Sequence, residues 1–518
     1  MKSLPLLLNR AVLSTPQSRA QSESNAITVA LVILMSIPVA LSFFFFQEQS
    51  IRLDEAQSLW QASRSIPEIL SVIASDVHVP LYHVLLHMWL QFFGNSIETA
   101  RLLSLIFYVA SIPALYALGA LAYGRRIGLF ATLLYSLSPF MNWYGNEARM
   151  YTLFTLCIIA NQYFFIRIFK STTTSSTLWF GYCLSAILGV FSHYFFFLNL
   201  ASQFVFLLWR IDIFPKGSFV RFAGSNLLVA AAFVPWVWYV VHLGQAGLSQ
   251  PLLVVPTSVD LFNTFSQFIF GFQVDSLNAL LLSLWPLAVV LGFLALRKGA
   301  RSVETEFFVT TVLISFGIVL LTSFILKPIF VSRYLIFTLP ALYLLLANVC
   351  AGYPPLLKYV VSLSVVAGMF ATLTIEITNP LAPVKENYAE AVSFLNTHAT
   401  VQDAIVLSAP FTIYPVEYYY RGPSRISTLP EWNQYAHGPI PAFSVDTLPT
   451  QVSHVSADAQ NVYLLLSYDQ GYEKTVQDYF EAHYHRLYTQ SFSKDLTLYV
   501  YRVRYDTSLS AASSTLPS

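Results

Sequence analysis

The sequence predicts an all-α, multi-pass membrane protein that carries a small α/β soluble domain near its C-terminal end. Of its 518 residues, 56% are hydrophobic and only 11% are charged, whereas soluble proteins carry roughly a quarter charged residues. The formal net charge of +1 gives no basic field that could hold nucleic acid. All three cysteines lie within apolar runs, so we expect neither a disulfide framework nor a cysteine-based zinc site.

A spanning helix needs about 20 mostly apolar residues, and by this measure the chain holds about eleven spans. Together they form a transmembrane domain over residues 27–378. Lys and Arg concentrate in the loops on the side of the N-terminus, which places the segment 1–26 in the cytoplasm. The predicted spans are residues 27–46, 100–122, 127–144, 148–169, 178–193, 194–209, 222–242, 276–296, 306–326, 334–351 and 357–376.

Residues 47–99 form a long outer loop whose segments are amphipathic and too short to span the membrane. Apolar residues recur at helical spacing before and after Pro67, and the run from Pro80 to Phe93 is apolar but short. Such patterns are typical of helices that lie in the membrane interface, so we expect three of them. His83 and His87 have the spacing of a metal pair, but no carboxylate follows at a useful distance, and we interpret them as packing residues.

Residues 379–506 differ in composition from the rest and predict a separate soluble domain. The segment from residue 380 onward holds 13 of the 27 acidic residues and 15 of the 30 tyrosines. A helix is expected over 388–396, with strands over 404–408, 462–466 and 496–500, which together favour a small α/β domain. The number of spans places this domain on the outer face, and the Ser- and Ala-rich tail 507–518 is expected to be disordered.

The polar residues of the membrane region fall on the outer face, at span ends or in the outer loop. Ionisable groups at membrane depth are costly unless they are paired or line a wet cavity, so we expect one cavity that opens outward. The candidate residues are Asp54, Glu55, Asp76, His78, Glu147, Arg149, Tyr151, His193, Arg333 and Tyr334.

Each candidate residue also has a simpler interpretation. Acids in a first helical turn, such as Asp54, can merely cap the helix, or one can accept a proton from an incoming hydroxyl. Arg149 and Arg333 suit phosphate binding, but an arginine at a span end can also be an interfacial anchor. The chain has no glycine-rich phosphate loop or nucleotide fingerprint, so we do not expect a soluble nucleotide donor.

The ordered motifs resemble a known family. They are Arg52-Leu53-Asp54-Glu55-Ala56, Asp76 to Gly94, Ala100 to Ser104, Ser138 to Tyr151, Ser192-His193-Tyr194, and Ser332-Arg333-Tyr334 with Pro340. This set resembles the bacterial lipid-linked glycosyltransferases of the GT-C class. The nearest branch is protein O-mannosyltransferase-like and includes aminoarabinose and lipopolysaccharide-core galacturonosyl transferases.

The resemblance implies transfer of a sugar from a polyprenyl phosphate to an acceptor hydroxyl at the outer face of the cytoplasmic membrane. Asp54 would be the base, with Glu55 beside it and with inversion at the anomeric carbon. Arg149, His193 and Arg333 would handle the phosphate, with a contribution from His78. The other candidate residues would bind substrate, and the acceptor would be a glycan, a lipid or a protein.

Two departures from the family pattern bear on which sugar donor and which cofactor the resemblance implies. Aminoarabinose transferases carry a Glu-Lys pair where this chain has His78-Val79, which disfavours that donor. The acidic pair is not the DxD motif of metal-dependent oligosaccharyltransferases, so no cofactor is certain and a divalent metal is left open.

Two other functions are weighed against this one. A glycolipid transporter or flippase would place charges near the bilayer midplane, often in repeated halves, and the sequence shows neither. A surface-glycan polymerase or ligase would depend on outer-loop arginines more than on an acidic pair after the first span.

Overall fold

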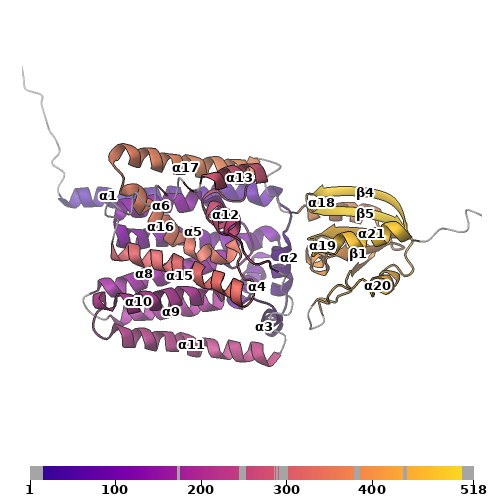
Figure 1. Cartoon of the computed structure of the whole chain (residues 1–518), viewed down its shortest axis with the longest axis horizontal. Coiled ribbons are helices and arrows are strands. Elements are labelled where there is room, and N and C mark those ends of the chain that lie inside the picture. Colours follow the sequence, from indigo (N-terminus) through magenta and orange to yellow (C-terminus); the bar gives the residue numbers. More distant parts are fainter. Residues whose placement is uncertain are drawn as a thin grey trace, which may run out of the picture.

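The computed structural model describes residues 16–171, 175–243, 253–284, 286, 290, 302–378, 386–435 and 440–503. A bundle of helices makes up most of the molecule, and a smaller part that contains a β-sheet lies against one end of the bundle (Figure 1). The predicted fold class is confirmed.

Seven helices within the described residues are long and apolar enough to cross a membrane, and each coincides with a predicted span. The protein is therefore a multi-pass membrane protein. The seven are α1 (Pro16–Glu48), α5 (Ile97–Tyr123), α8 (Tyr151–Lys170), α11 (Ser218–Leu243), α15 (Val303–Ile325), η2 (Ser332–Thr338) continued by α16 (Leu339–Ala351), and α17 (Pro355–Thr378).

The predicted span 127–144 is two helices, α6 (Arg125–Leu137) and α7 (Pro139–Gly145), rather than one. Ser138 separates them because it caps α7, its Oγ accepting the Met141 N–H at 3.0 Å. Pro139 follows at the first helical position, where its missing N–H does no harm. A single continuous span was therefore the wrong prediction for this segment.

The remaining predicted spans correspond to helices shorter than about 20 residues or lie partly outside the described residues. α9 (Ser176–Ser192) and α10 (Phe196–Trp209) have 17 and 14 residues, with a 3₁₀ turn, η1 (Ile211–Ile213), after them. α13 (Asp275–Ser283) begins the predicted span 276–296, about half of which lies outside the described residues. α12 (Ser258–Phe270) was not predicted, although Thr257 and Asp260 start it with a capping box.

The outer loop contains the three expected helices, α2 (Leu53–Ala62), α3 (Ile66–Ser75) and α4 (Leu81–Phe93). Ser65 and Glu68 start α3 with a capping box. Arg52 ends the extended segment after α1, and its backbone N–H donates to the Glu55 carboxylate at 3.0 Å. The chain thus enters α2 with two acids in its first turn.

Helices α5 and α6 approach each other most closely where glycines face each other. A Cβ added to Gly119 would lie 2.7 Å from the Cα of Gly128, and one added to Gly128 would lie 2.6 Å from the Ala120 backbone nitrogen. Small residues at such contacts let membrane helices pack backbone to backbone.

The C-terminal part is a five-stranded sheet with helices. Its strands are β1 (Ala404–Ser408), β2 (Arg425–Thr428), β3 (Asn461–Ser467), β4 (His485–Ser493) and β5 (Leu496–Arg502), in the spatial order β2-β1-β3-β5-β4. β1 is parallel to β2 and β3, whereas β5 is antiparallel to β3 and β4. The helices are α18 (Tyr388–His398), η3 (Pro410–Thr412), α19 (Ile413–Tyr419), α20 (Leu448–Val455) and α21 (Glu473–His483).

This C-terminal part is docked on the start of α2 and of α5. The Ile51 N–H donates to the Tyr419 hydroxyl at 2.9 Å, and the Ile97 N–H donates to the Tyr418 hydroxyl at 3.1 Å. Figure 1 shows α19 beside α2 at the end of the bundle. The first bond connects the sheet-containing part to the segment just before the acidic pair, and the second connects it to α5.

Candidate functional site

Asp54 lies in the first turn of α2 and is partly exposed at the protein surface. Its Oδ2 accepts from Nη1 of Arg333 at 3.1 Å, and 24% and 33% of the two side chains are exposed. Arg333 belongs to η2, so residues almost 280 positions apart along the chain form this ion pair. The pair is reachable from solvent and is held by two separate helices.

Arg149 lies behind this pair and is fully buried in the turn between α7 and α8. Its Nη1 donates to the Asp54 carbonyl oxygen at 3.3 Å and to the Ser58 Oγ at 3.1 Å, and its Nη2 donates to His78 Nε2 at 2.7 Å. A guanidinium only donates, so His78 must accept through Nε2 and carry its proton on Nδ1. Burial, and then the nearby cation of Arg149, lower the pKa of His78 well below its ordinary value, which agrees with a neutral ring.

Asp76 lies near the same nitrogen of His78 and is held by two amides of α2. Its Oδ2 accepts from the side-chain Nε2 of Gln57 and of Gln61, both at 3.1 Å, and lies 4.0 Å from His78 Nε2. Asp54, Gln57 and Gln61 follow one another at the three- and four-residue spacing of a single helix face. One face of α2 therefore joins Asp54 to Asp76.

The electrostatic environment keeps Asp54 ionised. Burial alone acts to raise the pKa of Asp54, but the cations of Arg333, Arg149 and Arg52 outweigh it and hold the pKa well below its ordinary value. At neutral pH this carboxylate can only accept a proton or a hydrogen bond.

Glu55, the other predicted catalytic acid, is completely buried. Its carboxylate accepts from Nε and Nη2 of Arg101, both at 2.8 Å, and from the Ala148 N–H at 3.1 Å. Neither Glu55 nor Arg101 has any exposed side-chain surface. These contacts support a structural role, joining α2 to α5 and to the turn that carries Arg149.

Glu147 is also buried in an ion pair, with Oε2 lying 2.9 Å from Nη1 of Arg52. The Arg52 guanidinium lies over the Trp143 ring, 4.7 Å from its centroid, a favourable cation–π geometry. Glu147 therefore holds Arg52 beside the first turn of α2.

His193 ends α9 and lies among aromatic rings. It stacks on Phe154 with centroids 4.7 Å apart, and its ring lies 5.6 Å from Tyr334 and 6.3 Å from Tyr151. The Phe195 N–H donates to His193 Nδ1 at 3.1 Å, so a neutral ring carries its proton on Nε2 and is a hydrogen-bond donor there. Among the described residues, the buried Tyr151 hydroxyl has no hydrogen-bond partner.

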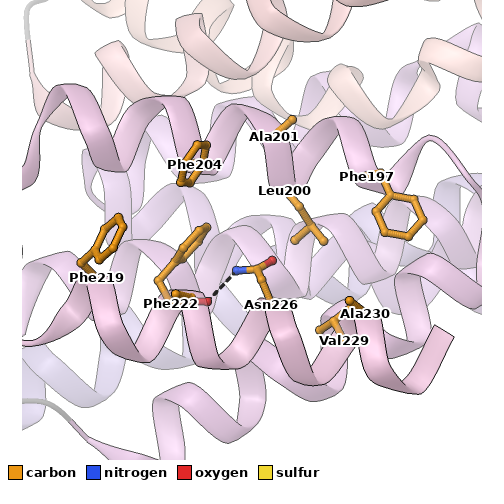
Figure 2. Close-up of a pocket in the computed structure, with 10 residues that line it drawn as sticks. Phe197, Leu200, Ala201, Phe204, Phe219, Phe222, Asn226, Val229 and Ala230 are labelled. Atoms are coloured by element: carbon orange, nitrogen blue, oxygen red, sulfur yellow. Dashed lines mark hydrogen bonds between the residues drawn. The ribbon is translucent and has the colours of Figure 1, made fainter. Parts of the chain in front are cut away.

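An apolar cavity of about 360 Å³ lies between α10 and α11. Figure 2 shows that Asn226 is the one labelled polar residue there, and that it donates to the Phe222 carbonyl oxygen, a contact of 2.8 Å. One end of the lining is Phe197, four residues after His193 in the sequence. The cavity thus begins close in sequence to the polar site.

A family model matches one segment of this chain, and solved structures match nearly all of it. Residues 77–239 match the family model of dolichyl-phosphate-mannose-protein mannosyltransferases. No curated protein matches the sequence. The crystal structure of ArnT from Cupriavidus metallidurans in the apo state has a TM-score of 0.62 at 11% identity, and the match covers 92% of this chain and 98% of that one.

Two further solved structures match this chain over most of its length. ArnT from Cupriavidus metallidurans bound to undecaprenyl phosphate gives a TM-score of 0.57 at 11% identity, over 90% of this chain and 97% of that one. The apo oligosaccharyltransferase of Archaeoglobus fulgidus gives 0.52 at 11% identity, over 90% of this chain and 74% of that one. The chain has the GT-C fold.

The resemblance to GT-C proteins inferred from the motifs is thus confirmed. The matched family segment contains His78, Glu147, Arg149, Tyr151 and His193, whereas Asp54 and Arg333 lie outside it. In this GT-C chain the ion pair between these two is therefore formed by residues on either side of the matched segment.

The sequence did not reveal the supporting residues of the site. Arg52, Ser58 and Arg101 bind the acids or Arg149, and the two glutamines hold Asp76. The glutamines had a usable signal, since they follow Asp54 on the same helix face. Arg101 had none, because its partner lies 46 positions away in the sequence.

The histidines and acids do not assemble a metal site in the part of the chain that is described. No group of three or more His, Cys, Asp or Glu side chains comes together there in a way that could hold a metal ion. His87, the second histidine of the pair with metal spacing, instead contacts the Ala62 carbonyl oxygen through Nδ1 at 2.8 Å. We therefore derive no reaction step through a metal.

Proposed function

We propose that this GT-C protein transfers a sugar from a polyprenyl-phosphate donor to an acceptor hydroxyl. One observation carries the proposal: the partly exposed Asp54 carboxylate is paired with Arg333 and backed by Arg149. Such a site combines a proton acceptor with cations that can bind a phosphate.

The two arginines can bind the donor phosphate without releasing Asp54. Arg333 uses Nη1 for Asp54, and Arg149 uses Nη1 and Nη2 for its three contacts. The Nε–H groups of both have no partner among the described residues. A guanidinium carries five N–H donors, so each can add bonds to phosphate oxygens, and the Nε2–H of His193 is a third donor nearby.

The apolar cavity between α10 and α11 is a suitable place for the polyprenyl tail. Its lining includes Phe197, four residues after His193 in the sequence. Several of its rings, such as Phe204 and Phe219, are exposed on the outside of the bundle. A tail lying there keeps apolar contacts, while its phosphate reaches the donors at the end of α9.

The chemical step follows from these positions. Asp54 accepts the proton of the acceptor hydroxyl as the acceptor oxygen forms a bond with the anomeric carbon. The bond from that carbon to the phosphate oxygen breaks, and the electron pair leaves with the phosphate. Arg333 and Arg149 stabilise the charge that develops on this leaving group. Attack opposite the leaving group inverts the anomeric configuration.

The topology supports an extracytoplasmic site. The excess of Lys and Arg in the loops on the side of the N-terminus places that side in the cytoplasm. Asp54 and the docked C-terminal part lie just after the first span, so we propose that both face outward from the cytoplasmic membrane.

The substitution Asp54→Asn tests the proposal. Asparagine keeps the shape but cannot take the proton, so we expect sugar transfer to fall by a hundredfold or more, on the order of other general bases. A strain that lacks the gene is complemented with each variant, and its envelope glycolipids and glycoproteins are compared by mass spectrometry. The species that gains a sugar residue should return with the native chain and not with Asp54→Asn.

The matched control is Asp260→Asn, which changes an exposed capping acid at the start of α12. It should restore the sugar-bearing species in full. Immunoblots check that both variants reach the membrane, and binding of undecaprenyl phosphate to the purified Asp54→Asn protein should match that of the native chain. Full transfer by Asp54→Asn would leave Asp54 a helix cap and refute the proposal.

A further inference from the structure

We propose that the acceptor is a carbohydrate chain, bound on an aromatic cluster between α2 and the C-terminal part. This inference rests on the proposed function and names the acceptor class. The aromatic cluster consists of Trp60 and Arg64 from the end of α2 and of Tyr414, Trp432 and Tyr435 from the C-terminal part.

The rings of the cluster are close and inclined to one another. The centroid of Trp60 lies 5.0 Å from that of Tyr414 and 5.9 Å from that of Tyr435. The Arg64 guanidinium lies 3.9 Å above the Trp60 ring and 5.5 Å from the Tyr435 ring. Cation–π contact therefore fixes a donor-rich side chain against the aromatic faces.

One ring of the cluster remains largely open. Tyr435 is 63% exposed, whereas Tyr414 is only 7% exposed and fills the interface. Packing of the C-terminal part on α2 thus does not require the outer face of Tyr435. The C–H face of a pyranose ring carries slight positive charge and suits the negative face of an aromatic ring, so Tyr435 offers a stacking surface for a sugar.

Polar groups without partners surround these rings. Among the described residues, the Trp60 indole N–H, the Gln61 amide oxygen and the Arg64 Nε have no hydrogen-bond partner. Gln61 is only 1% exposed, and buried polar groups normally find a partner. Sugar hydroxyls both donate and accept, so a sugar that reaches the rings can pair with the Trp60 and Arg64 donors.

The cluster lies at a suitable distance from Asp54. Trp60 follows Asp54 by six residues on α2, which is about 9 Å along the helix axis and about 120° around it, a separation that a short oligosaccharide can span. Gln57 lies between them on the helix and bonds Asp76. An acceptor chain can therefore present a terminal hydroxyl to Asp54 while a preceding sugar lies on the aromatic cluster.

A carbohydrate explains the composition of the cluster better than a lipid does. An acyl chain favours continuous apolar surface, whereas the guanidinium of Arg64 lies over two of these rings and interrupts it. Aromatic faces combined with a few orienting polar groups are typical of sites for small polar ligands.

The experiment measures binding of the purified full chain in lipid nanodiscs to an array of short neutral and acidic oligosaccharides, without donor. The native chain should retain a defined subset of them. Tyr435→Ala should weaken that binding about tenfold or more, as for a residue central to a contact. Trp60→Phe, which keeps a ring but loses the indole N–H, should weaken it less.

The matched control is Tyr488→Ala, which removes another exposed tyrosine, on β4. It should bind oligosaccharides as the native chain does. The inference is overturned if the native chain retains no oligosaccharide, if Tyr435→Ala binds like Tyr488→Ala, or if arrayed peptides or lipids are retained instead.

Failure of this binding test can be told apart from failure of the proposed sugar transfer. Asp54→Asn should lose transfer but keep oligosaccharide binding, because Asp54 is not part of the cluster. Loss of transfer in Asp54→Asn together with no effect of Tyr435→Ala would leave the transferase proposal standing and refute only the acceptor site.

Discussion

Asp54 and Glu55 are neighbours in sequence, yet they have opposite surroundings. Consecutive residues on a helix point about 100° apart, so one acid reaches the protein surface and the other faces α5. Asp54 meets Arg333 at a partly exposed position, whereas Glu55 meets Arg101 in the interior. The sequence could not separate them, because the residues that distinguish them are contributed by distant helices.

Glu55→Gln tests this difference. Breaking a buried ion pair leaves an uncompensated charge on Arg101 and costs about 3–5 kcal/mol. We expect a large fall in the Tm of the detergent-solubilised protein, whereas Asp54→Asn should melt close to the native chain. The measurement is a thermal melt followed by the loss of monodisperse protein.

Arg101→Gln is the control for this pair, and it should destabilise to a similar extent. Residues in direct contact show non-additive effects, so the Tm of the double variant should fall by less than the sum of the falls in the two single variants. A stable Glu55→Gln protein that has lost transfer would instead show that Glu55 acts in the reaction.

The residues that meet at the site were largely predictable as a set. A concentration of ionisable groups on one side of an apolar chain indicated a shared cavity, and the structure joins Asp54, His78, Arg149 and Arg333 by direct contacts. Their pairing was not predictable. It depends on how η2 and the turn before α8 approach α2, and no spacing within one helix encodes that approach.

At the scale of elements, the break between α6 and α7 has the clearest local cause. Both helices are apolar, so hydropathy alone joins them into one span, but the Ser138 cap and Pro139 start a new helix. The short α7 then leads into the turn that carries Glu147 and Arg149. α12 was missed for a related reason: at 13 residues it is too short for a search based on spanning length.

Gly128→Ala tests the close contact between α5 and α6. The new methyl group would lie 2.6 Å from a backbone atom of the partner helix, so the helices must separate. Such overpacking costs typically about 1–3 kcal/mol, and we expect a lower Tm. Gly224→Ala on α11 is the control, because nothing lies within 4 Å of its added Cβ. Equal Tm values for the two variants would show that this contact contributes no stability.

At the scale of the whole molecule, the bundle and the C-terminal part share hydrogen bonds next to the candidate site. β1, β3 and β5 were predictable because they are buried runs of apolar residues. β2 and β4 were missed, because much of their surface is exposed and polar. The docking of the C-terminal part on the bundle was not predictable, since it depends on tyrosine hydroxyls that accept hydrogen bonds from backbone N–H groups.

The double substitution Tyr418→Phe with Tyr419→Phe tests this docking. It removes two hydroxyls that accept from the Ile97 and Ile51 N–H groups. We expect faster hydrogen–deuterium exchange in the peptides that contain Ile51 and Ile97 and unchanged exchange in α8. Tyr488→Phe, at an exposed site on β4, should change neither. Unchanged exchange in the double variant would show that these bonds do not hold the two parts together.

The ion pair between Arg333 and Asp54 also bears on the order of events in a catalytic cycle. As long as the guanidinium faces the carboxylate alone, the depressed pKa of Asp54 makes it a weak proton acceptor. A phosphate that arrives on Arg333 brings negative charge and raises that pKa toward its ordinary range. Under the proposed function, binding of the lipid donor thereby activates Asp54 as the base, and without donor this carboxylate has little power to activate water or an acceptor.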